Sequence, residues 1–333
     1  MWSGSEQAAT VAEVTRLYPD ALAGAVKRGL AEADPSDDVL GEDARSKLII
    51  LAGLAFDVRL RPADVYVRGI ARKGMLTTRS ILEGSDLAAL RSLGHVPKLL
   101  SGAQCQRVNG ESRVIAWAQP AAVPATHPLA NVTGSENACL LRVESPLRRG
   151  LGTRPFQVML RGAGAGGPET ASSVISDIQF CARQLLVAGR IGTEGPKPST
   201  AVYNYGAAAF GRPQAQRDVA SLCLTDALVA PFLVRFLLTG TGENQGTVAG
   251  IAATLRDSGV GAEQFTVPGA PSSHLYLKTA PSSMRRVERA LETVLAVRGS
   301  DVALDILYLP LLEGIAWDDL SAAATGLRLA EEE

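Results

Sequence analysis

The most constraining feature of this sequence is the regular alternation of strand-like and helix-like segments after Pro231. In the second helix-like segment, Val287, Leu291 and Val294 recur at the spacing of one helix face. The expected elements are strand 232–238, helix 247–258, strand 262–267, strand 274–279, helix 283–297 and strand 302–309. This β-α-β-β-α-β order is that of the split, ferredoxin-like unit. The C-terminal part of the chain is therefore predicted to form such a unit.

A second feature lies near the start of the chain, where several carboxylates precede one lysine. Asp43 and Lys47 are four residues apart, so on a helix they lie on one face and within reach of each other. Asp38 lies in the approach to that helix, and Glu32 comes earlier. A lysine at the boundary between an acid cluster and the core is expected to be partly desolvated and paired. Such an environment suits a group that must hold or transfer a proton.

The helix that carries Lys47 is expected to be amphipathic. Its buried stripe is predicted to consist of Leu48, Ile49, Leu51 and Leu54. The alternative interpretation of the same stretch is a solvated helix cap with a surface ion pair, which by itself says little about function.

The run 31–52, A-E-A-D-P-x-D-D-V-x-G-x-D-A-x-x-K-L-x-I-L-A, resembles the substrate-site signature of homoserine dehydrogenases. The resemblance implies that Glu32 and Asp43 bind the substrate's ammonium group and that Lys47 acts on its distal oxygen. Asp38 would orient Lys47 and keep it charged. Leu30 departs from the family pattern, because it replaces the tyrosine of the G-Y-A-E tetrad.

A glycine-rich segment follows the strand-like run F-Q-V-M-L. Gly162, Gly164 and Gly167 fit G-x-G-x-x-G, but no second parallel strand ends in the acid that a ribose requires. Homoserine dehydrogenases have a similar G-x-G-A-G…T-A segment in their catalytic domain. The resemblance therefore implies that Gly164 lines the substrate cleft, and that the helix start at Thr170 faces an anion such as a carboxylate.

The step from loop to helix in the C-terminal unit, E-N-Q-G-T-V-A-G-I-A-A-T-L, resembles the start of ACT domains, which bind small amino acids at paired interfaces. Gly246 matches the family glycine, and Glu243 stands for the usual aspartate. The resemblance implies a weak effector site at these two residues. The alternative is an ACT-like fold used only for dimerisation.

The fold class expected is α+β, in which a mixed-sheet, homoserine dehydrogenase-like catalytic domain is followed by a ferredoxin-like βαββαβ ACT-type domain. The expected division is a catalytic and dimerisation domain at 1–190, a linker at 191–228, the ACT-like domain at 229–315 and a tail at 316–333. Within the first domain, patterning predicts a strand at 61–70, a helix at about 77–93, and strands at 95–100, 112–117 and 138–143.

Composition predicts an ordinary soluble protein. The 333 residues are 46% hydrophobic and carry a formal net charge of -1, which favours neither a nucleic-acid partner nor an anionic membrane. Four cysteines without C-x-x-C spacing and three distant histidines predict no metal site. A reducing cytoplasm is the expected compartment.

The resemblance covers the catalytic and C-terminal parts of a homoserine dehydrogenase but not its nucleotide-binding domain. The chain alone is therefore expected to bind no cofactor, and NAD(P) is expected only if a separate nucleotide-binding subunit supplies that domain. The expected substrate is a small amino acid such as aspartate semialdehyde or homoserine, and the expected assembly is a homodimer or homotetramer.

Two further hypotheses remain open. One is a repurposed, cofactor-independent lyase, dehydratase or cyclase that uses Lys47 as acid or base. The other is a non-catalytic, amino-acid-sensing subunit.

Overall fold

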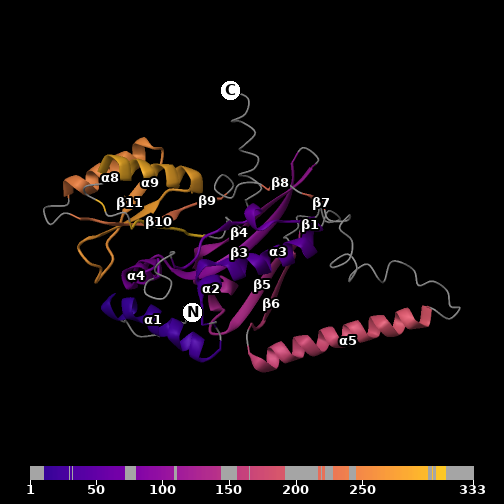
Figure 1. Cartoon of the computed structure of the whole chain (residues 1–333). Coiled ribbons are helices and arrows are strands. Elements are labelled where there is room, and N and C mark those ends of the chain that lie inside the picture. Colours follow the sequence, from indigo (N-terminus) through magenta and orange to yellow (C-terminus); the bar gives the residue numbers. More distant parts are fainter. Residues whose placement is uncertain are drawn as a thin grey trace.

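The structure is a computed structural model. It describes residues 11–29, 31, 33–71, 80–108, 111–143, 156–164, 166–191, 217–218, 220–221, 228–239, 245–298, 302 and 305–312. Figure 1 shows a long β-hairpin at the centre, the C-terminal sheet unit at one end of it, and one long helix, α5, that projects from the rest.

The N-terminal part is built on the hairpin of β3 (His95–Val108) and β4 (Glu111–Pro124), which stay in register from His95↔Pro124 to Val108↔Glu111. The elements before it are α1 (Val11–Lys27), α2 (Ser36–Leu40), α3 (Glu42–Phe56), β1 (Val58–Arg59), the 3-10 turn η1 (Pro62–Asp64), β2 (Tyr66–Val67) and α4 (Gly84–Ser92). Helix α3 packs on the hairpin through Leu48 and Ala52, which join Val114 and Ala116 in one cluster. The hairpin therefore supports the helix that carries Lys47.

A second hairpin, β5 (Glu136–Val143) with β6 (Phe156–Ala163), leads into α5 (Gly167–Ile191), and the short η2 (Pro128–Asn131) precedes it. Two short strands, β7 (Arg217–Asp218) and β8 (Ala220–Ser221), pair in parallel with β1 and β4. Both lie within the predicted linker, and each joins a strand of the N-terminal part.

The C-terminal unit contains β9 (Val229–Ala230), β10 (Phe232–Leu237), α8 (Gln245–Asp257), β11 (Ala262–Gln264), β12 (His274–Thr279), β13 (Ser282–Ser283), α9 (Met284–Arg298) and β14 (Leu307–Pro310). Its main sheet has the order β11-β12-β10-β14, and every pair in it is antiparallel. The predicted order of strands and helices is confirmed.

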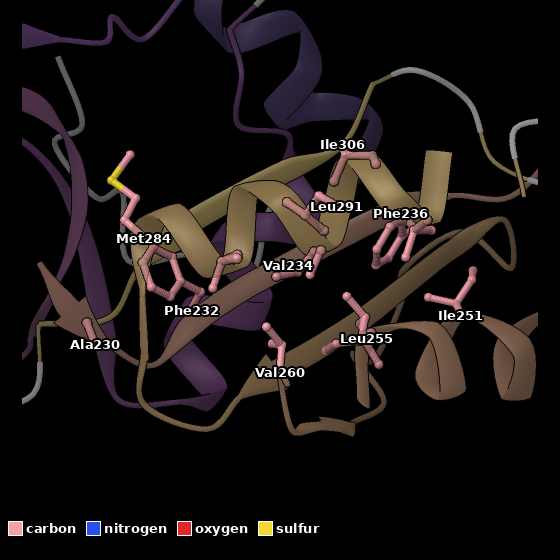
Figure 2. Close-up of a cluster of buried hydrophobic side chains, with 14 of the residues drawn as sticks. Ala230, Phe232, Val234, Phe236, Ile251, Leu255, Val260, Met284, Leu291 and Ile306 are labelled. Atoms are coloured by element: carbon pink, nitrogen blue, oxygen red, sulfur yellow. The ribbon is translucent and has the colours of Figure 1, made fainter. Parts of the chain in front are cut away.

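Helices α8 and α9 cover one face of this sheet. Alternate residues of β10, Phe232, Val234 and Phe236, pack there with Ile251, Leu255 and Leu291 (Figure 2). The intervening Leu233 belongs to a second cluster, which contains Leu90 of α4 and Leu309 of β14. Both faces of β10 are therefore buried, the second one against the N-terminal part.

Several predicted boundaries are wrong. The strand expected at 61–70 is the turn η1 followed by the two-residue β2, because Pro62 opens a turn whose Asp64 accepts the Arg61 backbone N–H at 2.8 Å. The helix expected from about residue 77 begins at Gly84; residues 72–79 lie outside the described part. The strand expected at 262–267 ends at Gln264, and the last strand begins at Leu307.

Candidate functional site

The predicted acidic stretch forms two short helices that meet at one glycine. Gly41 has φ +84°, a left-handed conformation that glycine adopts without steric cost, and it ends α2 and begins α3. Asp37 and Asp38 lie in the first turn of α2, and Asp43 lies in the first turn of α3. Helix N-termini attract negative charge, so both helix starts tolerate these carboxylates.

The predicted pair is formed. The ammonium of Lys47 lies 2.6 Å from Oδ2 of Asp43. The side chain of Lys47 is 58% exposed and that of Asp43 is 44% exposed. The expected partial desolvation of Lys47 is therefore wrong for the single chain: the pair lies at the surface, where water screens it.

The pair borders an acidic hollow. Its open volume is about 500 Å³, and it is lined by Asp34, Asp37, Asp38, Glu42, Asp43, Arg45 and Ser46. Two of these five carboxylates already have a cationic partner, because Arg45 forms an ion pair with Glu42 and Lys47 forms one with Asp43. Such an excess of carboxylates favours a cationic ligand, and an ammonium group of a small molecule satisfies that requirement. Across the described residues, no cluster of three or more acidic, histidine or cysteine side chains is arranged to hold a metal ion.

Glu32 and Glu243 lie outside the described residues. The other predicted site residues, Gly164, Thr170 and Gly246, are described and do not line the hollow. A Cβ at Gly164 would lie 2.2 Å from the side chain of Asn137, so the backbone there packs closely on the β5–β6 hairpin. Thr170 lies in the first turn of α5 and donates its backbone N–H to Gly166 at 3.0 Å. Neither of the two lines the acidic hollow.

Gly246 lies in the first turn of α8 and is exposed. A Cβ at this position would meet no described atom within 4 Å. Packing therefore gives no reason for glycine at this position.

Sequence reasoning missed the segment that supports the acidic helices from behind. A Cβ at Gly69 would lie 2.2 Å from the carbonyl oxygen of Val39 in α2, so only glycine fits at this position. The backbone N–H groups of Ile70 and Ala71 both donate to the same oxygen, at 2.8 and 3.2 Å. The sequence R-G-I carries no signal of this contact, because Gly69 and Val39 are brought together only by the fold.

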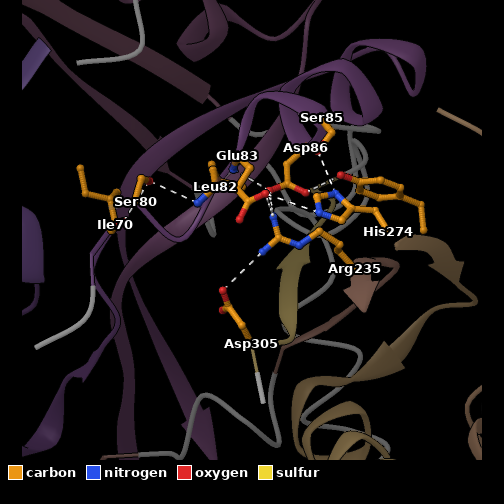
Figure 3. Close-up of polar contacts among 10 residues, drawn as sticks. Ile70, Ser80, Leu82, Glu83, Ser85, Asp86, Arg235, His274 and Asp305 are labelled. Carbon is orange, nitrogen blue, oxygen red and sulfur yellow. Dashed lines mark hydrogen bonds and ion pairs between the residues drawn. The ribbon is translucent and has the colours of Figure 1, made fainter. Parts of the chain in front are cut away.

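Sequence reasoning also missed a buried ion cluster between α4 and the C-terminal sheet. Arg235 of β10 is fully buried, and its Nη1 lies 2.5 Å from Oδ2 of the equally buried Asp86. Glu83 and Asp305 lie farther from the guanidinium, at 3.6 and 4.0 Å (Figure 3). Tyr276 donates to Asp86 at 2.9 Å. Burial raises the pKa of Asp86 to about 6, although Arg235 opposes this shift.

His274 completes this cluster on β12. Its Nδ1 lies 3.1 Å from the hydroxyl of Ser85, and its Nε2 lies 3.6 Å from Glu83 (Figure 3). The signal that could have revealed the cluster is the single arginine in the apolar run F-L-V-R-F-L. A charge in a fully buried strand requires a buried partner.

Comparison with known proteins gives a consistent result. The sequence model described as homoserine dehydrogenase matches residues 8–179. The homoserine dehydrogenase of Mycobacterium leprae is 40% identical over 185 residues, which are 55% of this chain and 36% of that protein. That of Corynebacterium glutamicum is 36% identical over 192 residues, which are 57% of this chain and 39% of that protein. The chain thus matches little more than a third of each relative's length.

Solved structures of similar fold extend over nearly the whole chain. A homoserine dehydrogenase from Thiobacillus denitrificans covers 92% of this chain with a TM-score of 0.62 and 24% identity, and 62% of that chain is matched. The S. aureus homoserine dehydrogenase at pH 6.0 covers 91% with a TM-score of 0.53 and 22% identity, again over 62% of its own length. At these identities the likeness shows the fold alone.

The described helices include none that is long and apolar enough to cross a membrane. The family model spans slightly more than half of the sequence, and it includes both the acidic helices and the hairpin that supports them. This chain therefore belongs to the homoserine dehydrogenase family.

Proposed function

We propose that this chain is the substrate-binding part of a homoserine dehydrogenase that acts on aspartate semialdehyde or homoserine. The observation that carries the proposal is the Asp43–Lys47 pair at the border of a hollow lined by five carboxylates. A nicotinamide-binding part from outside these residues, such as a separate subunit, would complete the enzyme.

The geometry supports a division of roles. The carboxylates of the hollow, Asp43 among them, compensate the charge of the substrate's ammonium group. The family resemblance adds Glu32, which lies outside the described residues, as a further partner. Lys47 donates a proton to the aldehyde oxygen as the carbonyl carbon is reduced, and it accepts that proton in the reverse direction. Asp38 lines the same hollow and is assigned the role of orienting Lys47. A nicotinamide cofactor, when bound, supplies or accepts the hydride.

Binding of homoserine to the full chain, measured by titration calorimetry, tests the site without a cofactor. Asp43→Asn should weaken binding by about tenfold or more, because it removes a charged partner of the ammonium group. Lys27→Ala is the matched control: this exposed lysine ends α1, away from the hollow, and its loss should leave the affinity unchanged. Equal affinity in wild type and Asp43→Asn would refute the proposal.

Turnover tests the chemical role of Lys47. After a nucleotide-binding subunit and NADPH are added, Lys47→Ala should lower kcat far more than it raises KM for aspartate semialdehyde. Equal effects on both constants would mean that Lys47 only positions the substrate.

Two alternatives are distinguished by the same protein. A cofactor-independent lyase, dehydratase or cyclase would convert homoserine or its O-substituted analogues without nucleotide, which mass spectrometry detects. A sensing subunit would bind an amino acid at the C-terminal unit, near Glu243 and Gly246, and Lys47→Ala would leave its activity intact. The antiparallel four-stranded sheet with α8 and α9 on one face supports an ACT-type assignment of that unit.

We also propose that the chain assembles as a homodimer or homotetramer. Large apolar side chains are exposed on three elements of the N-terminal part: Ile50, Leu51 and Leu54 on α3, Leu141 and Leu160 on the β5–β6 hairpin, and Val174, Ile175, Ile178 and Phe180 on α5. Exposed apolar patches of this kind mark interaction surfaces. The free thiols of Cys105, Cys139 and Cys181 support a reducing, cytoplasmic location.

A further inference from the structure

One arginine connects the C-terminal unit to the segment behind the acidic helices. The guanidinium of Arg68 lies 4.2 Å from the centre of the Tyr308 ring on β14, and it also donates to the carbonyl oxygen of Tyr308. The hydroxyl of Tyr308 donates in turn to Glu288 of α9 at 2.8 Å. A stacked guanidinium that also donates a hydrogen bond is fixed in both position and orientation.

The backbone of the same segment holds α2 and the Gly41 turn. The backbone N–H of Arg68 donates to the carbonyl oxygen of Ala118 in the central hairpin at 2.9 Å, which fixes the position of Arg68 along β4. A Cβ at Gly41 would lie 3.6 Å from the carbonyl oxygen of Arg68. Gly69 and Ile70 lie directly against Val39, which is next to Asp38. A shift of Arg68 therefore moves the turn at Gly41, which joins α2 with its Asp38 to α3 with its Asp43.

The contacts of Arg68 and Gly69 leave little room for independent movement. The guanidinium of Arg68 stacks on the Tyr308 ring, donates to the Tyr308 carbonyl and also interacts with Tyr66 of β2, whereas its buried Nη1 has no hydrogen-bond partner among the described residues. The backbone contact at Gly69 leaves no room for even one methyl group. Closely packed contacts of this kind transmit displacement instead of absorbing it.

A second connection runs parallel to the first (Figure 3). The hydroxyl of Ser80 donates to the carbonyl oxygen of Ile70 at 3.1 Å and accepts the N–H of Leu82 at 3.2 Å, just before the helix whose Asp86 binds Arg235. The C-terminal sheet thus contacts residues 68–71 directly through Arg68 and is linked to them indirectly through α4 and Ser80.

We propose that Arg68 is a positioning residue: it couples the position of the C-terminal sheet to the Gly41 turn and thereby to the acidic hollow. The inference rests on the proposed function for its ligand, homoserine, but not for the coupling itself. By thermodynamic reciprocity, a ligand bound in the hollow must also affect the C-terminal sheet.

Hydrogen exchange of the full chain tests the coupling without any ligand. Arg68→Met keeps an unbranched apolar stem and removes the charge, the hydrogen bond and the stacking. It should raise exchange at the amides of Ile70, Ala71 and Arg45 by about tenfold, while the amides of β10 and β12 keep their wild-type rates. The exchange rates of Arg68→Lys should fall between those of wild type and Arg68→Met, because an ammonium still attracts the ring but cannot stack on it.

Two controls separate coupling from general destabilisation. Arg28→Met removes an exposed arginine at the end of α1 and should change none of these amides. Tyr308→Phe keeps the ring under Arg68 and removes the hydroxyl that binds Glu288 and interacts with Tyr66, so it should change exchange less than Arg68→Met does. Arg68→Lys is the second variant if Arg68→Met fails to fold.

The ligand arm uses homoserine. In wild type, homoserine should slow exchange at β14, and Arg68→Met should abolish this effect and weaken homoserine binding by about fivefold or more. Failure of homoserine to bind wild type would refute the proposed function and leave the ligand-free arm as the test of coupling. The coupling itself is refuted if Arg68→Met raises exchange uniformly, or leaves residues 70–71 at wild-type rates.

Discussion

Removal of the carboxylate of Asp86 should be among the most destabilising single changes in this chain. The Asp86→Ala variant leaves the guanidinium of Arg235, which has no exposed surface, without its partner at 2.5 Å. Breaking a buried ion pair by removing one member costs about 3–5 kcal/mol, because the other charge stays buried. Tyr276 and the Glu83 N–H also lose their acceptor, at about 1 kcal/mol each.

The residual partners reduce this cost. Glu83 and Asp305 remain at 3.6 and 4.0 Å from the guanidinium, and both can move closer to it. The expected decrease in the free energy of unfolding at pH 7 is therefore about 4 kcal/mol. Asp305→Ala is the matched control: this carboxylate is more distant and 27% exposed, so its loss should cost less than about 1 kcal/mol.

Urea unfolding followed by circular dichroism and by tryptophan fluorescence measures both variants. Trp117 belongs to the core between the hairpin and the C-terminal sheet, so its emission reports on this junction. If Asp86→Ala loses no more stability than Asp305→Ala, Arg235 does not depend on Asp86, and the account of the buried cluster is wrong.

Three further predictions concern single residues. Burial raises the folded-state pKa of Asp86 to about 6, above its ordinary value. The part of the stability that depends on protonation of Asp86 is therefore full below about pH 4 and is lost as pH rises through 6, while the ion pair with Arg235 remains above that pH; Asp86→Asn should flatten the dependence of the urea midpoint on pH in this window. Gly69→Ala should destabilise the chain by about 2 kcal/mol or more, because its Cβ would collide with Val39. The control Gly24→Ala, in a helix with open space around it, should instead stabilise the chain by about 0.5–1 kcal/mol. Thermal unfolding compares the stability of the two variants. Leu54→Glu should convert the proposed dimer to a monomer in light scattering without loss of helical signal, because this side chain is 61% exposed in the single chain.

Local patterns predicted the parts of the fold that depend on near neighbours in sequence. The Asp43–Lys47 pair follows from helical spacing alone, and it formed as expected. The C-terminal order of elements followed from periodicity, but the strand ends did not. The ladder beyond Gln264 continues only as one bond, from the Phe265 N–H to Tyr276, and apolar composition does not reveal where such pairing stops.

Contacts between distant residues could not be predicted in this way. The buried stripe predicted for α3 is wrong at Leu51 and Leu54, which are 51% and 61% exposed, although Leu48 does face the hairpin. The run L-I-I-L-A-G-L-A-F is apolar all round, so its pattern does not show which side chains are buried. Arg235 and Asp86 are 149 residues apart, and nothing near either one identifies the other. The sequence did contain one unused signal: Asn109-Gly110, a typical hairpin dipeptide, lies between the two strands of the central hairpin.

The last strand of the C-terminal sheet does not end at a free edge. Beyond β14, Leu311 forms a bridge with Ala122 of β4, and the Leu312 N–H donates to the Ala122 carbonyl at 2.8 Å. The C-terminal sheet is thereby joined to the central hairpin by backbone contacts. A large rotation of the C-terminal unit would break these contacts of Leu311 and Leu312 with Ala122. Any coupled movement of the unit is therefore expected to be a small translation or tilt that keeps them.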